Sequence, residues 1–329
     1  MPNAARDWAR YNRLLVRQGR LDLFLSEEVL ARWAYAGPRR PGGKKLYSDL
    51  CLQTCLMLRE ILGLGLRQTT GLVQSIMAKA ALAIPVPDYT TLQRRAAALR
   101  VDLNPGRPGG GAAASAIVVA VDATGLTVTR RGEWNARRHG RTDGRWQSKW
   151  RKLHIVIDVA SGAILAAAYT SANQADCRLM PSLLDRIEVP IAAVCADMAY
   201  DTVKCRRAAH QRRAEQRIPP KRQARASRDN RNLRPHRAVL AERDAAIAAI
   251  LAHARAASPP GQPPAPAAIS AARRQWKEDI GYHRRSLVET TMARIKAHTS
   301  DRLSNRREDT RETQALVKCA ILNRLAQAA

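Results

Sequence analysis

The chain contains 329 residues and carries a formal net charge of +28, from 56 lysine and arginine residues against 28 aspartate and glutamate residues. Hydrophobic residues make up 46% of the sequence, a share that is typical of globular proteins and excludes wholesale disorder. No apolar run approaches the roughly 18 residues that a membrane span requires, and residues 1–20 are charged throughout and lack an apolar secretory core. We therefore predict a cytoplasmic protein of about two domains that makes no membrane contact.

The basic residues are concentrated in two blocks. Residues 130–152 contain nine basic and two acidic side chains, and residues 202–237 contain thirteen and two. Blocks of this kind are typical of proteins that bind a polyanion, most often nucleic acid. The alternative is a positive face that is merely solvated.

The six cysteines form no CxxC pair and have no histidine pattern beside them, which favours reduced structural cysteines over a metal site. Cys51 and Cys55, in CLQTC, are predicted to lie on a buried helix face.

Two low-complexity stretches, at 104–116 and 258–268, divide the chain into three parts. The first part is predicted to be helical, with helices over 46–64, 65–83 and 85–100 and a threonine as the N-cap of the last one. Three short helices of which the last is basic, at Arg94 and Arg95, resemble a helix-turn-helix that binds DNA.

The middle part has the pattern of an α/β layer with a mixed sheet. AIVVAVD (116–122) and TGLTVTR (124–130) predict one hairpin, and 152–160 with 163–170 predict a second. The remaining expected elements are a helix over 174–187, a buried strand over 191–197 and a helix over 201–213.

Asp122 and Asp197 each end one of the most apolar strands. Either could be a turn or helix cap. Together they are a candidate metal pair, because Mg²⁺ prefers a few carboxylates that leave room for water and phosphate. A third carboxylate would complete such a site.

The stretch GYHRRSLVETTMARIK (281–296) is predicted to be a helix. At about 100° per residue, four of its polar side chains fall within a stripe about 60° wide: Tyr282, Arg285, Glu289 and Lys296. Val288, Met292 and Ile295 form an adjoining apolar face that would pack on the sheet. A carboxylate between cations on such an edge suits metal binding beside a nucleic-acid backbone.

This spacing, Tyr-(2)-Arg-(3)-Glu-(6)-Lys, resembles the Y-(2)-R-(3)-E-(6)-K signature of DDE transposases from bacterial insertion sequences. VAVDATGL (119–126) resembles the first catalytic strand of that family, CADMAYDT (195–202) its second-aspartate region and VPDYTTLQRR (86–95) the end of its N-terminal region. Met198 stands where the family often has a glycine.

The resemblance implies that Asp122, Asp197 and Glu289 are the metal-binding carboxylates of an RNase H-like catalytic domain. It implies two Mg²⁺ ions, for which Mn²⁺ can substitute, and DNA 3′-end cleavage followed by strand transfer. Tyr282, Arg285 and Lys296 would contact DNA. The implied partners are double-stranded DNA, as terminal inverted repeats and target, and a second copy of the chain; the implied location is the bacterial nucleoid.

The predicted fold class is α/β: an RNase H-like mixed β-sheet flanked by helices, preceded by an all-α, helix-turn-helix-like N-terminal domain. The predicted organisation is a helical DNA-binding domain at 1–103, a linker at 104–116, the first part of the catalytic domain at 117–213, a basic, proline-rich insertion at 214–267 and C-terminal helices of the catalytic domain, carrying Glu289, at 268–329.

Several further side chains have a structural explanation that we favour. Asp158 is predicted to lie beside a turn, and Asp176 and Asp201 to cap helices. His154 is predicted to be structural rather than a phosphate contact. For the tryptophans of the first basic block, Trp134, Trp146 and Trp150, core packing is favoured over base stacking.

Three other functions remain open from the sequence. An RNase H-like nuclease or resolvase would share the carboxylates but lack strand transfer. A DNA-binding repressor with an idle catalytic domain would be expected to have lost a carboxylate. A basic RNA-associated protein would explain the charge but not the stripe over 281–296.

Overall fold

The computed structural model describes residues 7–38, 45–103, 115–128 and 150–327. Its contacts divide the chain into two compact units, here called the helical unit (Met1–Gly109, Gly125–Arg151 and Arg294–Ala329) and the sheet unit (Gly110–Thr124 and Lys152–Ala293). None of the helices in the described ranges is long and apolar enough to cross a bilayer. The predicted linker at 104–116 and most of the basic block at 130–152, including Trp134 and Trp146, lie outside these ranges.

The helical unit contains the N-terminal helices and the last helix of the chain. In order these are α1 (Trp8–Gln18), the 3₁₀ turn η1 (Leu21–Leu23), α2 (Glu27–Ala31), α3 (Asp49–Leu62), α4 (Leu66–Lys79), α5 (Tyr89–Ala96) and α12 (Glu308–Ala326). The helices predicted over 46–64, 65–83 and 85–100 are thereby confirmed as α3, α4 and α5.

Local capping sets the ends of these helices. The Ser48 hydroxyl accepts the Cys51 amide at 3.0 Å at the start of α3, and Gly63, with φ of 63°, ends that helix in the left-handed region. The predicted threonine cap of α5 is wrong. Asp88, which directly precedes the helix, takes that position, and its carboxylate accepts the Thr91 amide at 2.6 Å, because an aspartate there reaches the free amides of the first turn.

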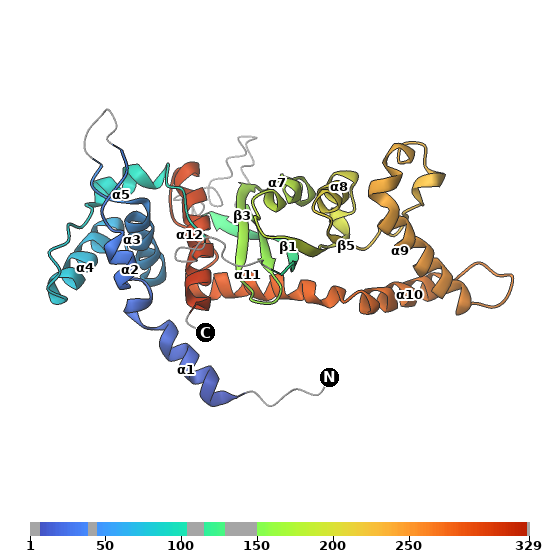
Figure 1. The fold of residues 1–329 in the computed structure, drawn as a ribbon, viewed down its shortest axis with the longest axis horizontal. Helices are drawn as coiled ribbons and strands as arrows, with labels where there is room; N and C mark the ends of the chain where they lie inside the picture. Colours follow the sequence, from blue (N-terminus) through green and yellow to red (C-terminus); the bar gives the residue numbers. More distant parts are fainter. Residues whose placement is uncertain (1–6, 39–44, 104–114, 129–149, 328–329) are drawn as a thin grey trace, which may run out of the picture. The chain divides into compact units, whose positions relative to one another are not determined.

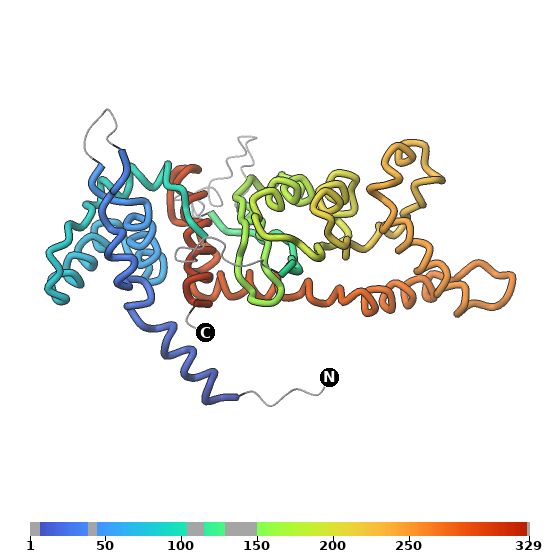
Figure 2. Tube along the Cα trace, viewed as in Figure 1, coloured from blue at the N-terminus to red at the C-terminus, as the bar shows by residue number. Residues whose placement is uncertain are grey.

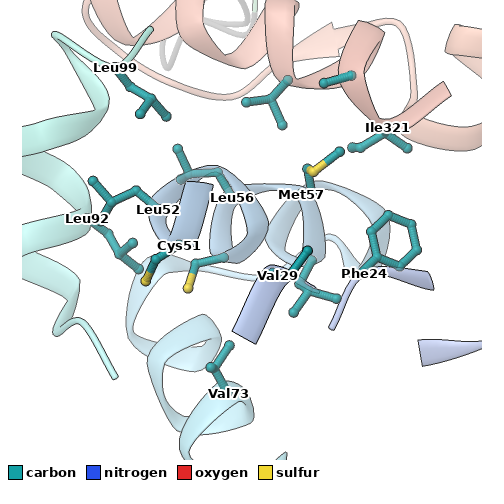
Figure 3. Close-up of a cluster of buried hydrophobic side chains, with 14 of the residues drawn as sticks. Phe24, Val29, Cys51, Leu52, Leu56, Met57, Val73, Leu92, Leu99 and Ile321 are labelled. Carbon is teal, nitrogen blue, oxygen red and sulfur yellow. The ribbon is translucent and has the colours of Figure 1, made fainter. Parts of the chain in front are cut away.

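The core of the helical unit joins the two ends of the sequence. Leu52, Leu56 and Met57 of α3 are buried in the same cluster as Ile321 of α12 (Figure 3). Cys51 and all five other cysteines are free thiols, and Cys51 and Cys55 are buried as predicted.

Polar contacts hold α12 in this core. The Thr313 hydroxyl donates to the Ala96 carbonyl at 2.6 Å, and the Asn323 amide donates to the Leu103 carbonyl at 2.7 Å. Lys318 is fully buried, where its ammonium donates to the Thr299 and Ser300 carbonyls. A buried cation needs such partners, so these bonds specify where α12 lies.

The sheet has the strand order β3-β2-β1-β4-β5, and β6 pairs with the end of β1 at Thr127 and Val128. Figure 1 labels β1, β3 and β5 of this sheet. The strands are β1 (Ile117–Val128), β2 (Trp150–Asp158), β3 (Ile164–Ser171), β4 (Ile191–Cys195), β5 (Glu215–Arg217) and β6 (Arg302–Leu303). Pairing of β1 with β4 and of β4 with β5 is parallel, and β2 and β3 form the predicted hairpin, which confirms a mixed sheet. The predicted α/β class with a preceding helical region is therefore confirmed.

The first predicted hairpin is wrong, because Ile117–Val128 form one continuous strand rather than two. Gly125 lies inside this strand and does not mark a turn. A Cβ at Gly125 would make an ordinary van der Waals contact, at 3.4 Å, with the Trp150 ring.

Helices cover the sheet. They are the 3₁₀ turn η2 (Asp176–Arg178), α7 (Met180–Leu184), the 3₁₀ turn η3 (Met198–Tyr200) and α8 (Val203–Gln211). The helix predicted over 174–187 is shorter than expected, since Pro181 can begin an α-helix but cannot continue one from η2.

The basic, proline-rich region contains helices that the sequence pattern did not predict. After the 3₁₀ turns η4 (Ser227–Asp229) and η5 (Arg234–His236), α9 (Arg237–Ala256) leads to α10 (Pro266–Asp279), against which it packs (Figure 2). Ile250 and Trp276 belong to the buried cluster that the two helices share. From α10 the chain passes through Gly281 into the 3₁₀ turn η6 (Tyr282–Arg285) and then α11 (Ser286–Thr299).

Asp201 connects this region to the rest of the sheet unit. The predicted cap of α8 at Asp201 is wrong, because Thr202 is the N-cap. The Asp201 carboxylate instead accepts Arg206 Nε at 2.8 Å and Arg243 Nε at 3.1 Å, all three side chains being buried. Its other oxygen accepts the Lys221 amide at 2.8 Å.

Replacing Asp201 by alanine is expected to lower the free energy of unfolding by about 3–5 kcal/mol, because two buried guanidinium groups would lose their counter-charge. Urea unfolding followed by circular dichroism measures the change. The control is Asp229→Ala, whose exposed pair with Arg228 should contribute less than about 0.5 kcal/mol. Equal effects of the two substitutions would contradict the proposed importance of the buried cluster.

Candidate active site

Strand register brings Asp122 and Asp197 to the same edge of the sheet. In the parallel pair, Val119 lies opposite Val194 and Ala120 lies opposite Cys195. Asp122 and Asp197 each follow this last pair by two residues, so the register places them beside each other where β4 ends. In a parallel sheet such a strand end is where functional side chains gather.

Asp122 is partly buried and its two oxygens are both bonded. One accepts the Ala123 amide at 2.8 Å and the other accepts the Arg285 guanidinium at 2.7 Å. Burial raises the pKa of Asp122, the Ala123 amide and Arg285 oppose that rise, and the charge of Asp197 adds to it. The repulsion shows that the two carboxylates share one electrostatic environment.

Asp197 has a second role in the backbone. Its carboxylate accepts the Ala199 amide at 2.7 Å and caps η3. Capping uses one oxygen only, so the other remains available to a ligand.

Arg285 joins Asp122 to Glu289. One nitrogen of its guanidinium donates to Asp122 and the other donates to Glu289 one turn into α11. The Glu289 side chain is 55% exposed, whereas Arg285 and Asp122 are each 19% exposed. Glu289 therefore lies at the open side of the site.

The helix predicted over 281–296 begins later than expected. Tyr282–Arg285 form the 3₁₀ turn η6, after Gly281 with φ of 66°, and the α-helix starts at Ser286. A 3₁₀ turn has three residues per turn rather than 3.6, so a single stripe calculated for an α-helix from Tyr282 is wrong. Val288 and Met292 are buried as predicted.

Tyr282 lies in the electrostatic field of the carboxylates. Burial raises the pKa of Tyr282 to about 12, with Arg285 lowering it and Asp197 and Asp122 raising it. The hydroxyl is therefore protonated at neutral pH and can donate a hydrogen bond.

Tyr200 is a member of this site that we did not single out from the sequence. It is 1% exposed, and its hydroxyl has no hydrogen-bond partner among the described residues. Burial raises the pKa of Tyr200, and the charges of Asp122, Asp176 and Asp197 raise it further. The signal available in the sequence was its place three residues after Asp197.

Three polar side chains, Lys152, His154 and Asp176, form a cluster on the adjoining part of the sheet. The predicted helix cap at Asp176 is wrong, because its carboxylate accepts the Lys152 ammonium at 2.8 Å instead. His154 is buried and structural, as predicted, and its Nε2 lies 2.8 Å from the Thr170 hydroxyl. Asp158 closes the β2–β3 turn as predicted, by accepting the Ala160 and Ser161 amides.

The remaining predicted DNA contacts lie away from the carboxylates in the sequence. Lys296 lies on α11 seven residues after Glu289, about 10 Å along the helix axis. Arg94 is exposed on α5, whereas Arg95 donates to the Tyr47 carbonyl at 2.6 Å and to Asp49 at 2.5 Å. Trp150 is 42% exposed at the start of β2.

The donor set fits a hard divalent cation in its chemistry. Carboxylates such as Asp122, Asp197 and Glu289 are the ligands that Mg²⁺ prefers, and the charge of Asp197 raises the pKa of Asp122. Within the described ranges, no three acidic, histidine or cysteine side chains are close enough to form a ready-made metal site. Here the Arg285 guanidinium supplies the positive charge between Asp122 and Glu289.

Lowering the pH from 7.5 to 5.5 is expected to destabilise the protein in part through His154. Burial lowers the pKa of His154, with Lys152 acting in the same direction and Asp176 opposing. Below about pH 6.5 the unfolded chain therefore binds a proton that the folded protein does not, and stability falls until the folded pKa is reached.

Histidine NMR titration should place the midpoint of His154 below that of a free histidine. The free energy of unfolding of wild type should fall more over this pH interval than that of His154→Gln, by up to about 1.4 kcal/mol per unit of pKa difference, as measured by urea unfolding at the two pH values. A midpoint at or above 6.5 would contradict the effect of burial.

Two family models match the chain, and both are described as a transposase DDE domain. One matches residues 16–131 and the other matches residues 114–324. The second match spans all six strands that the structure describes in the sheet. It includes Asp122 on β1, Asp197 after β4 and Glu289 on α11. The mixed sheet with helices around it, preceded by a helical region, is consistent with an RNase H-like domain of this kind. The chain therefore belongs to the family of DDE transposases.

Proposed function

We propose that the protein is a transposase of the Y-(2)-R-(3)-E-(6)-K branch from a bacterial insertion sequence, which cleaves DNA at the 3′ ends of its element and joins them to a target. The observation that carries this proposal is the Arg285 guanidinium that joins Asp122 of β1 to Glu289 of α11, with Asp197 beside Asp122 in the β1–β4 register. Family membership supports a nucleic-acid substrate.

In this proposal Asp122, Asp197 and Glu289 hold divalent metal ions. When bound, Mg²⁺ or Mn²⁺ would neutralise charge on the scissile phosphate and promote in-line attack by an oxygen nucleophile. The chain's part is to position those ions from three separate elements, of which β1 and β4 are held in register by backbone hydrogen bonds.

Arg285 and Tyr282 would act on the DNA itself. The Arg285 guanidinium carries a fixed positive charge and planar donors that match a phosphate. Tyr282 keeps its proton at neutral pH, since its pKa is about 12, so it would donate a hydrogen bond to a phosphate oxygen rather than attack as a phenolate. Lys296 would bind a phosphate further along the same DNA.

End recognition is proposed for the helical unit. Arg94 is exposed on α5 and has no ion pair among the described residues, so its charge is available to a DNA phosphate. Arg95 binds Tyr47 and Asp49 and would chiefly position α5 against the start of α3. A homodimer would bind the two inverted repeats of the element on bacterial nucleoid DNA.

Glu289→Gln is expected to lower DNA nicking and joining at least about 100-fold, because even outer partners of metal ligands contribute 10–100-fold. Binding of the gene's own flanking DNA should persist. A denaturing gel with labelled flank DNA and Mg²⁺ measures cleavage and joined products. The control is Glu278→Gln, an exposed glutamate on α10 with no ion pair among the described residues.

The same experiment separates the other functions. Nicking without joined products would favour a nuclease or resolvase, and flank binding without cleavage in Mg²⁺ or Mn²⁺ would favour a DNA-binding repressor. Cleavage by Glu289→Gln at the wild-type rate would rule out the proposed metal site.

Arg94→Gln and Arg95→Gln are expected to differ. Arg94→Gln should weaken binding to the element's ends and reduce the slope of log K against log salt by about 0.9, as for one lost phosphate contact, with stability unchanged. Arg95→Gln should lower the free energy of unfolding by on the order of 1 kcal/mol through its lost bonds to Tyr47 and Asp49. Salt-titrated fluorescence anisotropy and urea unfolding measure the two effects, and a reversed pattern would contradict these assignments.

A further inference from the structure

A basic groove lies beside the carboxylates within the sheet unit. It is a cavity of about 480 Å³, with Met198, Arg222, Arg273, Arg274, Lys277 and Tyr282 among its lining residues. Met198 directly follows Asp197, and Tyr282 lies in the same 3₁₀ turn as Arg285, which binds Asp122, so the groove is lined by residues next to the candidate active site. A second cavity of about 840 Å³ shares Met198 and Arg222 with it.

The charge of the basic groove is not neutralised by the protein. Across the described ranges, no carboxylate forms an ion pair with Arg222, Arg274 or Lys277, in contrast to Arg206 and Arg243, which share Asp201. Burial lowers the pKa of Arg273, and the charge of Arg222 lowers it further. Like charges held together in this way favour an anionic ligand.

The wall of the basic groove is held in place by specific bonds. The Arg273 guanidinium donates to the Pro220 carbonyl at 2.7 Å, the Lys221 carbonyl at 3.1 Å and the Arg222 carbonyl at 3.2 Å. Asp201 accepts the Lys221 amide from the other side. Arg273 is therefore a structural residue, and the segment that carries Arg222 is positioned on the surface before any ligand binds.

The basic groove combines cations with an apolar and aromatic side. Pro219, Ile269 and Met198 line it together with the Tyr282 ring, and the Lys277 ammonium lies 5.1 Å from the centre of that ring. Such a surface can bind two features of a nucleic-acid strand. Its cations can pair with phosphates, and its apolar and aromatic faces can pack against bases. A cavity of this size accepts nucleotides one at a time, as small-molecule pockets do, and not a double helix.

We propose that the basic groove binds the phosphate backbone of an unpaired DNA strand next to the bond that is cleaved, with Arg222, Arg274 and Lys277 as the phosphate contacts. This inference rests on the proposed function, since it assigns to the groove a strand of the DNA that reaches Asp122, Asp197 and Glu289. It gives the basic, proline-rich region a role in substrate binding: the region supplies Arg222 and, through Arg243, holds Asp201 in place.

The test compares two triple variants of the full-length protein with the same change in charge. The groove variant is Arg222→Gln with Arg274→Gln and Lys277→Gln, and the control is Lys204→Gln with Arg231→Gln and Arg255→Gln, three exposed cations of the sheet unit outside the groove. Fluorescence anisotropy in EDTA measures binding to a thymidine oligonucleotide of about 12 nucleotides, a usual single-strand site size, and to a blunt duplex. Thermal melting followed by circular dichroism checks that each variant is folded. If the triple groove variant melts at a lower temperature than wild type, the single variant Arg274→Glu, at an exposed position, replaces it in the binding assay.

We expect the groove variant to bind the oligonucleotide at least about tenfold more weakly, with a salt slope reduced by about 2, while the control stays within about threefold of wild type. The groove variant should bind the blunt duplex with nearly the same affinity as wild type. Wild-type affinity of the groove variant for the oligonucleotide would overturn the proposal, as would an equal loss in the control. An equal loss on oligonucleotide and duplex would overturn the assignment to an unpaired strand.

These outcomes are independent of the proposed catalysis because no cleavage occurs in EDTA. If Glu289→Gln abolishes nicking while the groove variant binds the oligonucleotide normally, the groove proposal fails and the proposed function stands. If the groove variant loses the oligonucleotide but neither wild type nor any variant nicks the flank DNA, the groove stands and the proposed function fails.

Discussion

The Arg285 guanidinium is the interaction on which the arrangement of the site depends. Two carboxylates, Asp122 and Glu289, come from a central strand and a helix that are far apart in the sequence. Burial and the charge of Asp197 both disfavour the charged form of Asp122 and raise its pKa. A single planar cation that donates to both offsets this repulsion. It also holds the start of α11 against the end of the β1–β4 pair, so the same contact that neutralises the charge positions the third carboxylate.

The arginines of this strongly basic chain divide into two groups by their partners. Arg206 and Arg243 are buried on Asp201, and Arg273 is bonded to three backbone carbonyls. These side chains hold the loop and helices of the basic, proline-rich region in place. Arg222 and Arg274 have no carboxylate partner among the described residues, and their charge is therefore left for a ligand. Net charge alone does not distinguish the groups, because the difference is made by burial and geometry.

The helical unit shows how the ends of the chain are used. Residues 317–325 of α12 lie in one core with residues 24–99, and the buried Lys318 binds the carbonyls that end α11. After α11, which carries Glu289, the chain forms β6 and then α12, which packs among the N-terminal helices. The sequence had suggested assigning 268–329 to the catalytic domain as a whole, whereas contacts group 294–329 with the N-terminal helices.

The sequence by itself determined those features that depend on neighbouring residues. Apolar runs specified α3, α4, α5, the β2–β3 hairpin, β4 and α8, and the spacing of Tyr282, Arg285 and Glu289 resembled the family to which the chain belongs. Asp122 and Asp197 could be chosen because each follows an apolar run, although Asp122 lies within β1 and only Asp197 follows the end of its strand. Local pattern failed at Thr124–Gly125, where β1 continues without a turn, and at Tyr282–Arg285, where a 3₁₀ turn follows the left-handed Gly281.

Only the tertiary structure decided which charged side chains share partners. Asp201 and Asp176 had the local appearance of helix caps, yet their partners Arg243 and Lys152 lie 42 and 24 residues away. Arg273 carried no sequence signal of its role, since that role arises from the carbonyls of a distant loop, and the only signal for Tyr200 was its place three residues after Asp197. Helical periodicity and strand alternation record only which face of an element is buried. They do not record which other element lies against that face, and it is this pairing that creates both the site and the basic groove.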